Sequence, residues 1–308
     1  SKTDRQYDSL LAVDEEAIDK AFQYFKPHIR NKLKDIVFTM MLKANLYKIT
    51  GEAEQYNILF EGVPGTGKTF SAMCINDLIH LPYVFVNTNT SDEILVGKKD
   101  DSPGSMTQGI LQMGQKTHGN TGSIILDDGD RAEIKNTHTR SLTLNLLDSS
   151  KSTYRDLYFD ANVPKPLFFI MTANYADKLG FALKNRIHVH ISFEDVFTNE
   201  GKYKILEDYV YTLIEKYSHL PYSARREDFS DEEWAELINQ AILEGEIQKD
   251  HGIRTAKSAA SDYYHKKCQQ TYKQYFQELE NEKRRLEDEE KRKKQALENE
   301  KRRLEDEE

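Results

Sequence analysis

The chain has 308 residues, with 43 lysine and arginine side chains against 52 acidic ones, which gives a formal net charge of -9. That length suffices for about two domains with a sizeable core, and the acidic balance gives no support to nucleic-acid binding through bulk charge. No apolar run approaches the roughly 18 residues of a membrane-spanning helix, which excludes such a helix from the sequence given. Two cysteines, Cys74 and Cys268, are too few for a disulfide framework and lack metal-ligand spacing.

The first 50 residues predict an N-terminal helical segment, with apolar residues at helical spacing over residues 15–48. The extreme N-terminus, Ser1 to Arg5, is polar, has no signal-peptide core and does not begin with methionine. We therefore expect a trimmed chain in a reducing cytoplasm, and a lost organelle-targeting leader stays open.

Residues 51–195 alternate strand and helix signals. Short apolar runs that read as buried strands lie at residues 56–60, 83–87, 123–127, 167–172 and 187–193, and helical stretches lie at about 68–80, 106–117, 139–148 and 176–185. Strands that alternate with helices predict a parallel sheet covered on both faces, an α/β domain. Residues 200–217, 230–245 and 254–276 then read as helices, which predicts a helical subdomain over 196–276, joined near residues 194–200.

The last 30 residues are a charged repeat. Residues 279–308 hold 12 acidic and 10 basic side chains, and the stretch LENEKRRLEDEE occurs twice, 18 residues apart. Eighteen residues make five turns, so repeated residues return to the same face, and acids precede bases at i,i+4. Residues 277–308 therefore predict an exposed charged helix; a weak coiled coil through the thin leucine stripe and a disordered segment are the alternatives.

The strongest chemical signal follows the first predicted strand and matches G-x-x-x-x-G-K-[ST]. Its residues are Gly62, Val63, Pro64, Gly65, Thr66, Gly67, Lys68 and Thr69, and Phe70 follows directly as part of the predicted nucleotide site. The glycines let the backbone wrap a phosphate, and amides at the start of the next helix point at it. We expect Lys68 to neutralise the β- and γ-phosphates of ATP and the Thr69 hydroxyl to reach Mg²⁺.

An acidic pair ends the third predicted strand, in the stretch SIILDD. An apolar strand that ends in paired carboxylates is the Walker B pattern, in which Asp127 would hold Mg²⁺ through water and Asp128 would orient or deprotonate the attacking water. The alternative is a turn at the strand end, built from Asp128, Gly129 and Asp130.

Three polar residues complete the predicted site. Asn174 follows the fourth strand, where an amide can help to hold the attacking water beside the γ-phosphate. Arg186 precedes the last strand, and Arg254 opens a helix of the second subdomain. Considered singly, each arginine could equally be an ordinary exposed residue of the surface.

In this order and spacing, the motifs GVPGTGKT, IILDD, TAN, LKNR and GIR resemble an AAA+ ATPase module, over roughly residues 50–270. The resemblance implies a P-loop fold with a five-stranded parallel sheet, a helical lid and a ring that is usually hexameric. It also implies that Asn174 is sensor 1, that Arg186 is an arginine finger acting on the neighbouring subunit's nucleotide, and that Arg254 is sensor 2.

Within this family the sequence is most similar in motif order to the ATPase module of Lon-type proteases, but two features differ. A charged helix follows where Lon proteins carry a protease domain, so we expect no peptidase activity. The loop at residues 97–104, GKKDDSPG, lacks the aromatic residue that threading members of the family present to the pore. Processive threading of a polypeptide is therefore not expected from the resemblance alone.

A third difference concerns the rate of hydrolysis. The family pattern at the acidic pair is Asp-Glu, whereas this chain has Asp127 and Asp128. The Asp side chain is shorter by one methylene, and a misplacement of about 1 Å can cost about 10²-fold in rate. The leading hypothesis is a ring-forming ATPase, with weak but real hydrolysis, that remodels or dissociates a protein partner. The alternatives are a nucleotide-switched assembly scaffold and, third, a DNA-handling loader, which the alternating charges of the tail disfavour.

Overall fold

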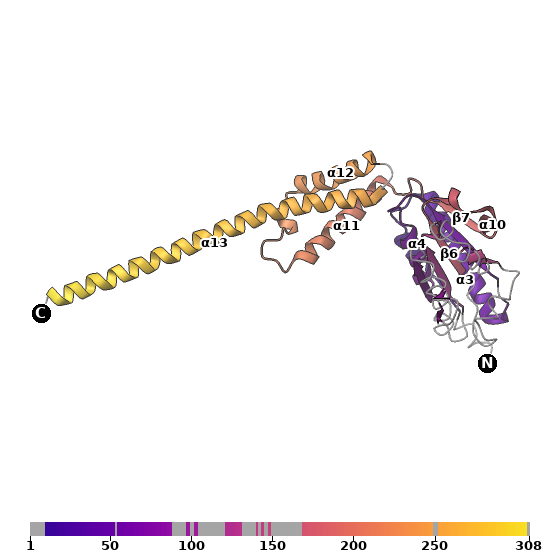
Figure 1. The fold of residues 1–308 in the computed structure, drawn as a ribbon, viewed down its shortest axis with the longest axis horizontal. Helices are drawn as coiled ribbons and strands as arrows, with labels where there is room; N and C mark the ends of the chain where they lie inside the picture. Colours follow the sequence, from indigo (N-terminus) through magenta and orange to yellow (C-terminus); the bar gives the residue numbers. More distant parts are fainter. Residues whose placement is uncertain are drawn as a thin grey trace. The chain divides into compact units, whose positions relative to one another are not determined.

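The computed structural model describes residues 10–52, 54–87, 97–98, 102–103, 121–130, 140, 143–144, 147–148, 168–248 and 252–306. The chain divides into two compact units, Ser1–Lys202 with Lys249–Ile253, and Tyr203–Gln248 with Arg254–Glu308. Each unit is described by itself below, with the helices and strands labelled as in Figure 1. Among the described residues, no helix combines the length and the apolar character needed to span a membrane.

The first unit contains a five-stranded sheet in the order β2-β5-β6-β1-β7, with β1 next to the edge strand β7. Its strands are β1 (Tyr56–Glu61), β2 (Tyr83–Asn87), β5 (Ser123–Asp127), β6 (Phe168–Ala173) and β7 (Val189–Ser192). All four pairings are parallel, which confirms the predicted five-stranded parallel sheet. The carboxyl ends of parallel strands meet at one edge, so the residues after β1, β5 and β6 are brought together there.

Helices cover both faces of this sheet. One face packs on α2 (Glu15–Ala21), α3 (Pro27–Thr50) and α4 (Lys68–Leu78), through a core that includes Ile58 and Phe60 of β1. The other face, with Leu59 of β1, packs on Leu183 of α10 (Phe181–Lys184) and on residues around Leu147 and the short helix η1 (Ala176–Lys178). Successive side chains of a strand point to opposite faces of the sheet, so alternate residues of β1 pack in two different cores.

The helical stretch expected over residues 15–48 is interrupted in the structure, because the chain breaks between α2 and α3. Pro27 occupies the first turn of α3, where a missing N–H costs nothing, and cannot continue a preceding helix. In the break, Phe25 forms an isolated bridge with Phe197, and the Lys26 N–H donates to the Val196 carbonyl at 2.7 Å. A contact across about 170 residues therefore overrides the local helical pattern.

The other predicted elements correspond closely where they can be compared. The expected helix over 176–185 is divided into η1 and α10, and a two-stranded antiparallel ladder, β3 (Gly97–Lys98) with β4 (Ser102–Pro103), was not expected. The expected helix at 106–117 lies outside the described residues, as does half of the one at 139–148.

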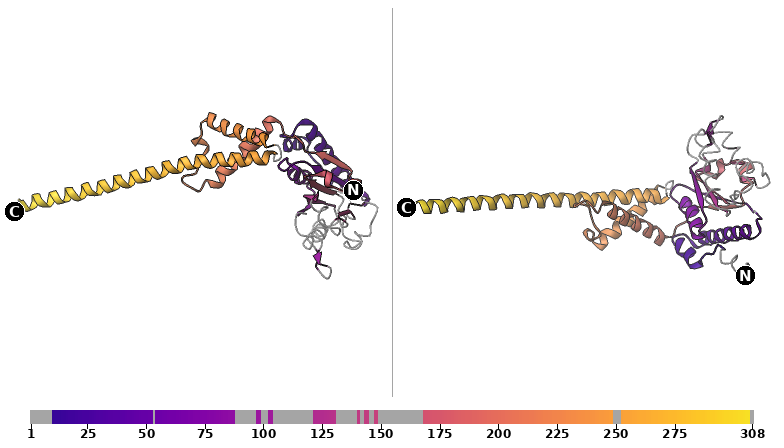
Figure 2. Two further views of the ribbon diagram at one scale, coloured as in Figure 1. Left: turned by 45° about the horizontal axis from the view of Figure 1, so that its top comes forward. Right: turned by 90° about the horizontal axis from the view of Figure 1, so that it is seen from below.

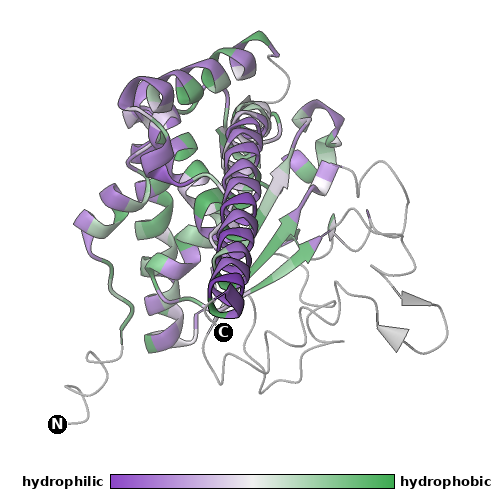
Figure 3. Ribbon diagram, turned by 90° about the vertical axis from the view of Figure 1, so that its left-hand side faces the viewer, coloured by the Kyte–Doolittle hydropathy of each residue, from purple (hydrophilic) through white to green (hydrophobic). Residues whose placement is uncertain are grey.

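The second unit is helical, with α11 (Asn199–Tyr217, which begins in the first unit), η2 (Arg226–Asp228), α12 (Asp231–Ile247) and α13 (Gly252–Asp306). The beginning of α13 packs through buried Tyr264, whose hydroxyl donates to the Ala224 carbonyl at 3.1 Å. The rest of α13 runs past α11 and α12, as both views in Figure 2 show. It is almost wholly hydrophilic (Figure 3), and every described residue from 276 to 306 is exposed.

Candidate functional site

The loop between β1 and α4 is built as the motif predicts. Its first amide, Gly62 N–H, donates to the Ala173 carbonyl at 3.1 Å, which fixes the loop to the end of β6. Lys68 is almost fully buried, and its ammonium group donates to the carbonyls of Gly62 at 2.6 Å and Val63 at 2.9 Å. The loop therefore folds around the lysine, directly at the N-terminus of α4, where helix amides and the helix dipole favour an anion.

A cluster of three aromatic rings, Phe25, Phe193 and Phe197, packs against this loop at Gly67. Gly67 adopts φ 89°, and a Cβ atom on it would lie 2.9 Å from the ring of Phe25. Phe25 stacks on Phe197 with ring centroids 5.1 Å apart and meets Phe193 edge-on at 6.0 Å. Gly67 is thus required both for the left-handed backbone and for the close approach of the ring, so the break between α2 and α3 helps to shape the phosphate loop.

A second glycine of the loop lies against Phe193, the residue that follows β7. Gly62 adopts φ 153°, and a Cβ atom there would come within 2.7 Å of the Phe193 carbonyl oxygen. The backbone after β7 therefore leaves no room for a side chain at the start of the loop.

The carboxylate of Asp127 joins the phosphate loop to the sheet. Its Oδ1 accepts from the Thr69 hydroxyl at 2.8 Å and from the Thr172 hydroxyl at 2.7 Å. The two predicted magnesium-binding residues, Thr69 and Asp127, are therefore in direct contact although 58 residues separate them. A hydroxyl and a carboxylate are hard oxygen ligands that suit Mg²⁺, which usually takes only one or two protein ligands and completes its shell with water and phosphate.

Asp128 sits at the turn after β5 in a left-handed backbone conformation, with φ 55°. Its N–H donates to the Thr172 hydroxyl at 3.0 Å, so Thr172 fixes both members of the acidic pair. The next residue, Gly129, approaches β6 so closely that a Cβ atom would lie 2.5 Å from Met171. The acidic pair and the turn, which the sequence offered as alternatives, are thus present together.

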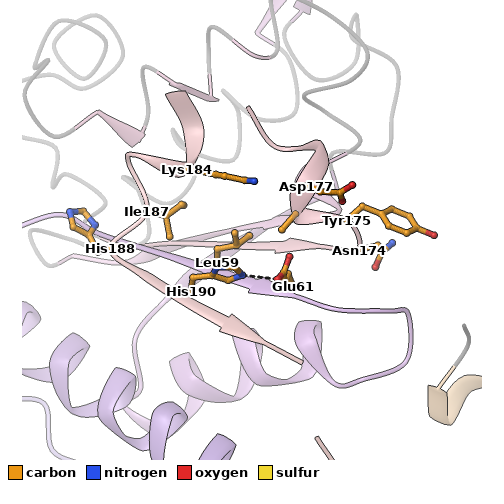
Figure 4. Close-up of a pocket in the computed structure, with 10 residues that line it drawn as sticks. Leu59, Glu61, Asn174, Tyr175, Asp177, Lys184, Ile187, His188 and His190 are labelled. Atoms are coloured by element: carbon orange, nitrogen blue, oxygen red, sulfur yellow. Dashed lines mark ion pairs between the residues drawn. The ribbon is translucent and has the colours of Figure 1, made fainter. Parts of the chain in front are cut away.

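Asn174 lies at the end of β6, beside the acidic turn. The neighbouring Tyr175 N–H donates to Asp130 Oδ2 at 3.2 Å, which ties the loop after β6 to the loop after β5. Asn174 also lines a pocket of about 520 Å³ that it shares with Glu61, His188 and His190. In Figure 4, Asn174 lies at one end of this pocket, and Glu61 Oε1 forms an ion pair with His190 Nε2 (3.1 Å) among the lining residues.

His188, at the far end of that pocket in Figure 4, is held as a hydrogen-bond acceptor. Its Nδ1 accepts from the Asn57 N–H at 2.9 Å, so this nitrogen carries no proton. Burial lowers the pKa of His188, and the nearby charge of Lys43 lowers it further. His188 therefore belongs to the packing at the sheet edge as a neutral imidazole.

Arg186 makes contacts within its own unit. One guanidinium nitrogen donates to the Ala182 carbonyl at 2.6 Å, and the other pairs with Asp148 at 3.3 Å. Its carbonyl accepts from the buried Asn57 side chain at 2.8 Å, which fixes the backbone at this position. Arg186 is thus held in place by contacts within its own unit, and its action on a neighbouring subunit stays a prediction.

The remaining predicted residues are less closely tied to the site. Phe70 lies in the first turn of α4 and is 55% exposed, so it can meet a bound nucleotide or a partner. Arg254 is an exposed residue in the first turn of α13 and belongs to the second unit, so its predicted contact with the phosphates stays a prediction. Among the residues that the structure describes, no group of three or more His, Cys, Asp or Glu side chains could hold a metal ion.

Sequence reasoning missed three contributors to the site: Thr172, Phe25 and Asp148. A signal existed for Thr172, since it is a polar residue near the end of an apolar strand that was expected to lie near the acidic pair. Phe25 carried no such signal, because an apolar residue at helical spacing looks like any other core residue. Asp148 follows an apolar pair in the sequence, and only the fold shows that it faces Arg186.

Comparison with known proteins gives the following findings. Residues 58–195 match the family described as "ATPase family associated with various cellular activities (AAA)". The Lon protease of Methanosphaera stadtmanae is 29% identical over 187 residues, which is 58% of this chain and 22% of that protein. The mitochondrial Lon protease homologues of Debaryomyces hansenii and Scheffersomyces stipitis are 24% and 22% identical over 162 residues, which is 51% of this chain and 15% of each homologue.

These matches agree with the sheet order and with the phosphate loop. The chain spans about a fifth or less of the length of the curated relatives that it matches. The likeness is therefore to one segment of those proteins, the segment that contains the nucleotide motifs. The P-loop fold predicted from the sequence is confirmed, as is the resemblance to the ATPase segment of Lon proteins.

Proposed function

From the premise that residues 58–195 are an AAA-type ATPase module similar to that of Lon proteases, we propose that the chain binds ATP with Mg²⁺ and hydrolyses it. One observation carries the proposal. The Thr69 hydroxyl and the Asp127 carboxylate meet at 2.8 Å, directly beside the N-terminus of α4. A phosphate-binding loop and a carboxylate that can hold Mg²⁺ are of use to a nucleoside triphosphate only when they converge on one point.

Four residues in and around the loop have separate roles in this proposal. Lys68 moves its charge from the loop carbonyls to the β- and γ-phosphates, and the amides at the start of α4 bind the same oxygens. Thr69 and Asp127 would hold Mg²⁺, Asp127 through a water molecule, and Phe70 would contact the nucleotide from the first turn of α4. The ion would supply positive charge that neutralises the phosphates during transfer of the γ-phosphoryl group to water.

Asp128 and Asn174 are the residues that we assign to the attacking water. The Asp128 backbone is fixed by Thr172, so its short carboxylate can reach further only if the turn moves. Hydrolysis is therefore slow compared with a site that carries glutamate at this position. The side-chain amide of Asn174 orients the water and does not accept its proton.

We further propose that the active form is a ring, with six subunits as the expected number. Arg186 of one subunit acts on the nucleotide of its neighbour, where an arginine in trans stabilises charge in the transition state. In the single chain the Asp148 carboxylate holds Arg186, at 3.3 Å, and keeps it in place until a neighbour docks. Arg254 couples the helical second unit to the phosphates of the same chain.

The work that this cycle performs is the remodelling or dissociation of a protein partner, without peptidase activity. A nucleotide-switched scaffold is the second candidate, and the observation that favours it is Asp128, because slow hydrolysis gives long-lived ATP states. A DNA-handling loader is the third. The two cysteines are unpaired in the structure, which fits the reducing cytoplasm that we propose as the compartment.

The decisive experiment for nucleotide binding compares Lys68→Ala with Lys32→Ala in the full chain. Lys32 is an exposed lysine on α3 of the same unit, so its removal takes away the same charge far from any predicted role. At ATP·Mg²⁺ concentrations 100 times the dissociation constant, binding stabilises the native state by about 2.7 kcal/mol. We expect thermal stabilisation by ATP·Mg²⁺ in the Lys32→Ala protein and none in Lys68→Ala. Equal stabilisation of both variants would show that the loop is not the nucleotide site.

Sharing of sites between subunits is tested by mixing two inactive variants, Arg186→Ala and Lys68→Ala. At mixed interfaces, one intact Lys68 faces one intact Arg186, so part of the ATPase rate should return. A wild-type protein that hydrolyses ATP at full specific activity as a dilute monomer would contradict the ring.

A further inference from the structure

A single buried hydroxyl lies between the two members of the acidic pair. Thr172 is 1% exposed and belongs to β6, the central strand of the sheet, where its Cα pairs with Phe60 of β1. Its hydroxyl donates to Asp127 Oδ1 at 2.7 Å, and the same oxygen accepts from the Asp128 N–H at 3.0 Å. One atom therefore contacts both the side chain of the predicted metal ligand and the backbone of the residue assigned to the attacking water.

The direction of both hydrogen bonds follows from the groups involved. An ionised carboxylate only accepts and a backbone N–H only donates, whereas a hydroxyl has one proton and two lone pairs. The Thr172 proton therefore lies toward Asp127, and one of its lone pairs lies toward Asp128. A side chain without a hydroxyl at this position would satisfy neither partner.

We propose that Thr172 is a positioning residue of the ATPase site, which holds the carboxylate of Asp127 and the backbone of Asp128 in one fixed relation. It acts through these two residues and touches neither the nucleotide nor the attacking water. This role rests on the ATPase function proposed above. Binding of Mg²⁺ and activation of water then depend on the same hydroxyl, although different carboxylates perform them.

Asp127 Oδ1 accepts from two hydroxyls, and these differ in how firmly they are placed. Thr69 belongs to the phosphate loop, next to Lys68, whose ammonium group must leave the loop carbonyls when it binds phosphate. Thr172 lies inside β6, which pairs with β1 on one side and with β5 on the other. The Asp127 carboxylate therefore keeps one fixed donor while the loop rearranges around the nucleotide.

The turn at Asp128 needs support because its backbone is unusual. Its φ of 55° is a left-handed conformation that few residues other than glycine adopt. The next residue, Gly129, packs tightly against β6, and the Tyr175 N–H donates to Asp130 Oδ2 at 3.2 Å. These contacts hold the rest of the turn, and the Thr172 hydroxyl holds the Asp128 N–H itself.

Removing the hydroxyl should therefore disturb the acidic pair without unfolding the loop around it. The Asp127 carboxylate loses one of its two hydroxyl donors, and the Asp128 N–H loses this acceptor. A partly buried N–H that lacks a partner is unfavourable, which favours a shift of the turn toward water. A displacement of about 1 Å at a reacting group can cost about 10²-fold in rate.

Thr172→Val tests the proposal most directly, because valine keeps the branched shape that suits a strand and lacks the hydroxyl. A second pair, Thr172→Ser and Thr172→Ala, differs by the hydroxyl alone and does not depend on the folding of the valine variant. The matched control is Ser123→Ala. It removes a fully buried hydroxyl from the first residue of β5, at the opposite end of that strand from Asp127.

The first measurement is the Mg²⁺ concentration that gives half of the extra thermal stabilisation by ATP, relative to ATP with a chelator. Loss of a group that orients a metal ligand typically weakens metal binding, so we expect this concentration to rise about tenfold in Thr172→Val and Thr172→Ala. It should stay within about threefold of the starting protein in Thr172→Ser and Ser123→Ala. Stabilisation by ATP in the chelator should not change, since Lys68 and the loop amides bind phosphate without the ion.

The second measurement is the steady-state ATPase rate at saturating Mg²⁺. In Thr172→Val and Thr172→Ala, kcat should fall about tenfold or more, with a much smaller change in KM for ATP·Mg²⁺. The reason is that the transition state depends on the placement of Asp128, whereas binding of the substrate does not. Thr172→Ser should recover most of the rate, because it keeps the hydroxyl.

A threonine with a purely structural role would lower the melting temperature of its variants and leave the Mg²⁺ concentration and kcat as in Ser123→Ala. That result would overturn the proposal, as would a loss in Thr172→Ser equal to that in Thr172→Ala. A starting protein that ATP·Mg²⁺ does not stabilise, and that does not hydrolyse ATP, would instead contradict the proposed ATPase function and with it any role of Thr172. The response of the starting protein therefore distinguishes the two failures.

Discussion

The phosphate loop (residues 62–69) and the exposed outer part of α13 (residues 276–306) are held in place by different kinds of contact. The loop rests on contacts between residues far apart in the chain, such as Phe25 with Phe193 and Thr69 with Asp127. The outer part of α13 rests on near neighbours, such as Lys293 with Glu289 at 2.9 Å and Arg302 with Glu298 at 3.0 Å. Burial therefore fixes the geometry of the loop, whereas local charge pairs maintain a helix that has no core of its own.

This difference predicts very unequal costs for removing one apolar side chain. Phe193 is fully buried and meets Phe60 at 5.1 Å as well as Phe25, so Phe193→Ala should lower the free energy of unfolding of the sheet by about 3–5 kcal/mol. Leu297→Ala, on the exposed stripe of α13, should change it by less than about 0.5 kcal/mol. Hydrogen–deuterium exchange of peptides from β1 measures both, and a similar loss of protection in the two variants would contradict the comparison.

The next prediction concerns the polar part of the loop site, at Asp128. Asn tolerates the left-handed backbone at this position about as well as Asp, so Asp128→Asn removes the charge without straining the turn. We expect kcat for ATP hydrolysis to fall about 10²-fold or more, with little change in ATP affinity. A rate that Asp128→Asn leaves unchanged would remove Asp128 from the catalytic residues.

Asp128→Glu sharpens that result in the opposite direction. If the short carboxylate limits the reaction, the extra methylene restores its reach, and kcat should rise by up to about 10²-fold in steady-state assays. A fall in kcat would instead mean that the turn held by Thr172 already places the Asp carboxylate correctly.

The contrast between long-range and local contacts also explains how much of the site could be predicted from the sequence. Lys68, Thr69 and the acidic pair were predictable because each occupies a fixed place relative to a strand end, and parallel strands bring their ends together. The supporting contacts from Phe25 and Asp148 were not, because each depends on a distant segment that periodicity does not register. The antiparallel β3–β4 ladder was missed for a related reason, since strands of two residues carry no alternation.

The fold itself was largely predictable for an equally physical reason. Parallel strands inside a sheet tend to be continuous apolar runs, and the runs predicted at residues 83–87 and 123–127 coincide with β2 and β5. The helical stretch predicted over residues 15–48 is divided before Pro27, where the apolar spacing continues across a break in the backbone. In α13, by contrast, local pairing alone predicted a helix, and the structure contains one without interruption.

A smaller effect is expected at the sheet edge from protonation of His188. Its pKa is lowered in the native state, so the unfolded state binds more protons as the pH falls below the ordinary histidine value of about 6.5. The contribution of His188 to stability should therefore be constant above that pH and decrease below it. Protonation of Nδ1 also removes the hydrogen bond from Asn57, which is worth about 1 kcal/mol.

His188→Asn is the matched control, because its Oδ1 can replace Nδ1 as the acceptor and does not titrate. Urea unfolding at pH 7.5 and pH 5.5 should show a smaller loss of stability in His188→Asn than in the starting protein. An equal pH dependence in both proteins would show that other groups control it.

The smallest effect expected of any single contact lies in the outer part of α13. Each i,i+4 ion pair there is worth roughly 0.2–0.5 kcal/mol, and the pairs are exposed, with side chains 54 to 75% accessible. Salt screens such charges, since the Debye length falls from about 10 Å at 0.1 M to about 3 Å at 1 M. Raising the salt concentration from 0.1 to 1 M should therefore increase exchange of amides in residues 280–306, while amides of β1 and β6, which depend on apolar burial, should change little. Salt that loosens β1 as much as α13 would show that the sheet also depends on surface charge, and that the two regions are not stabilised by different means.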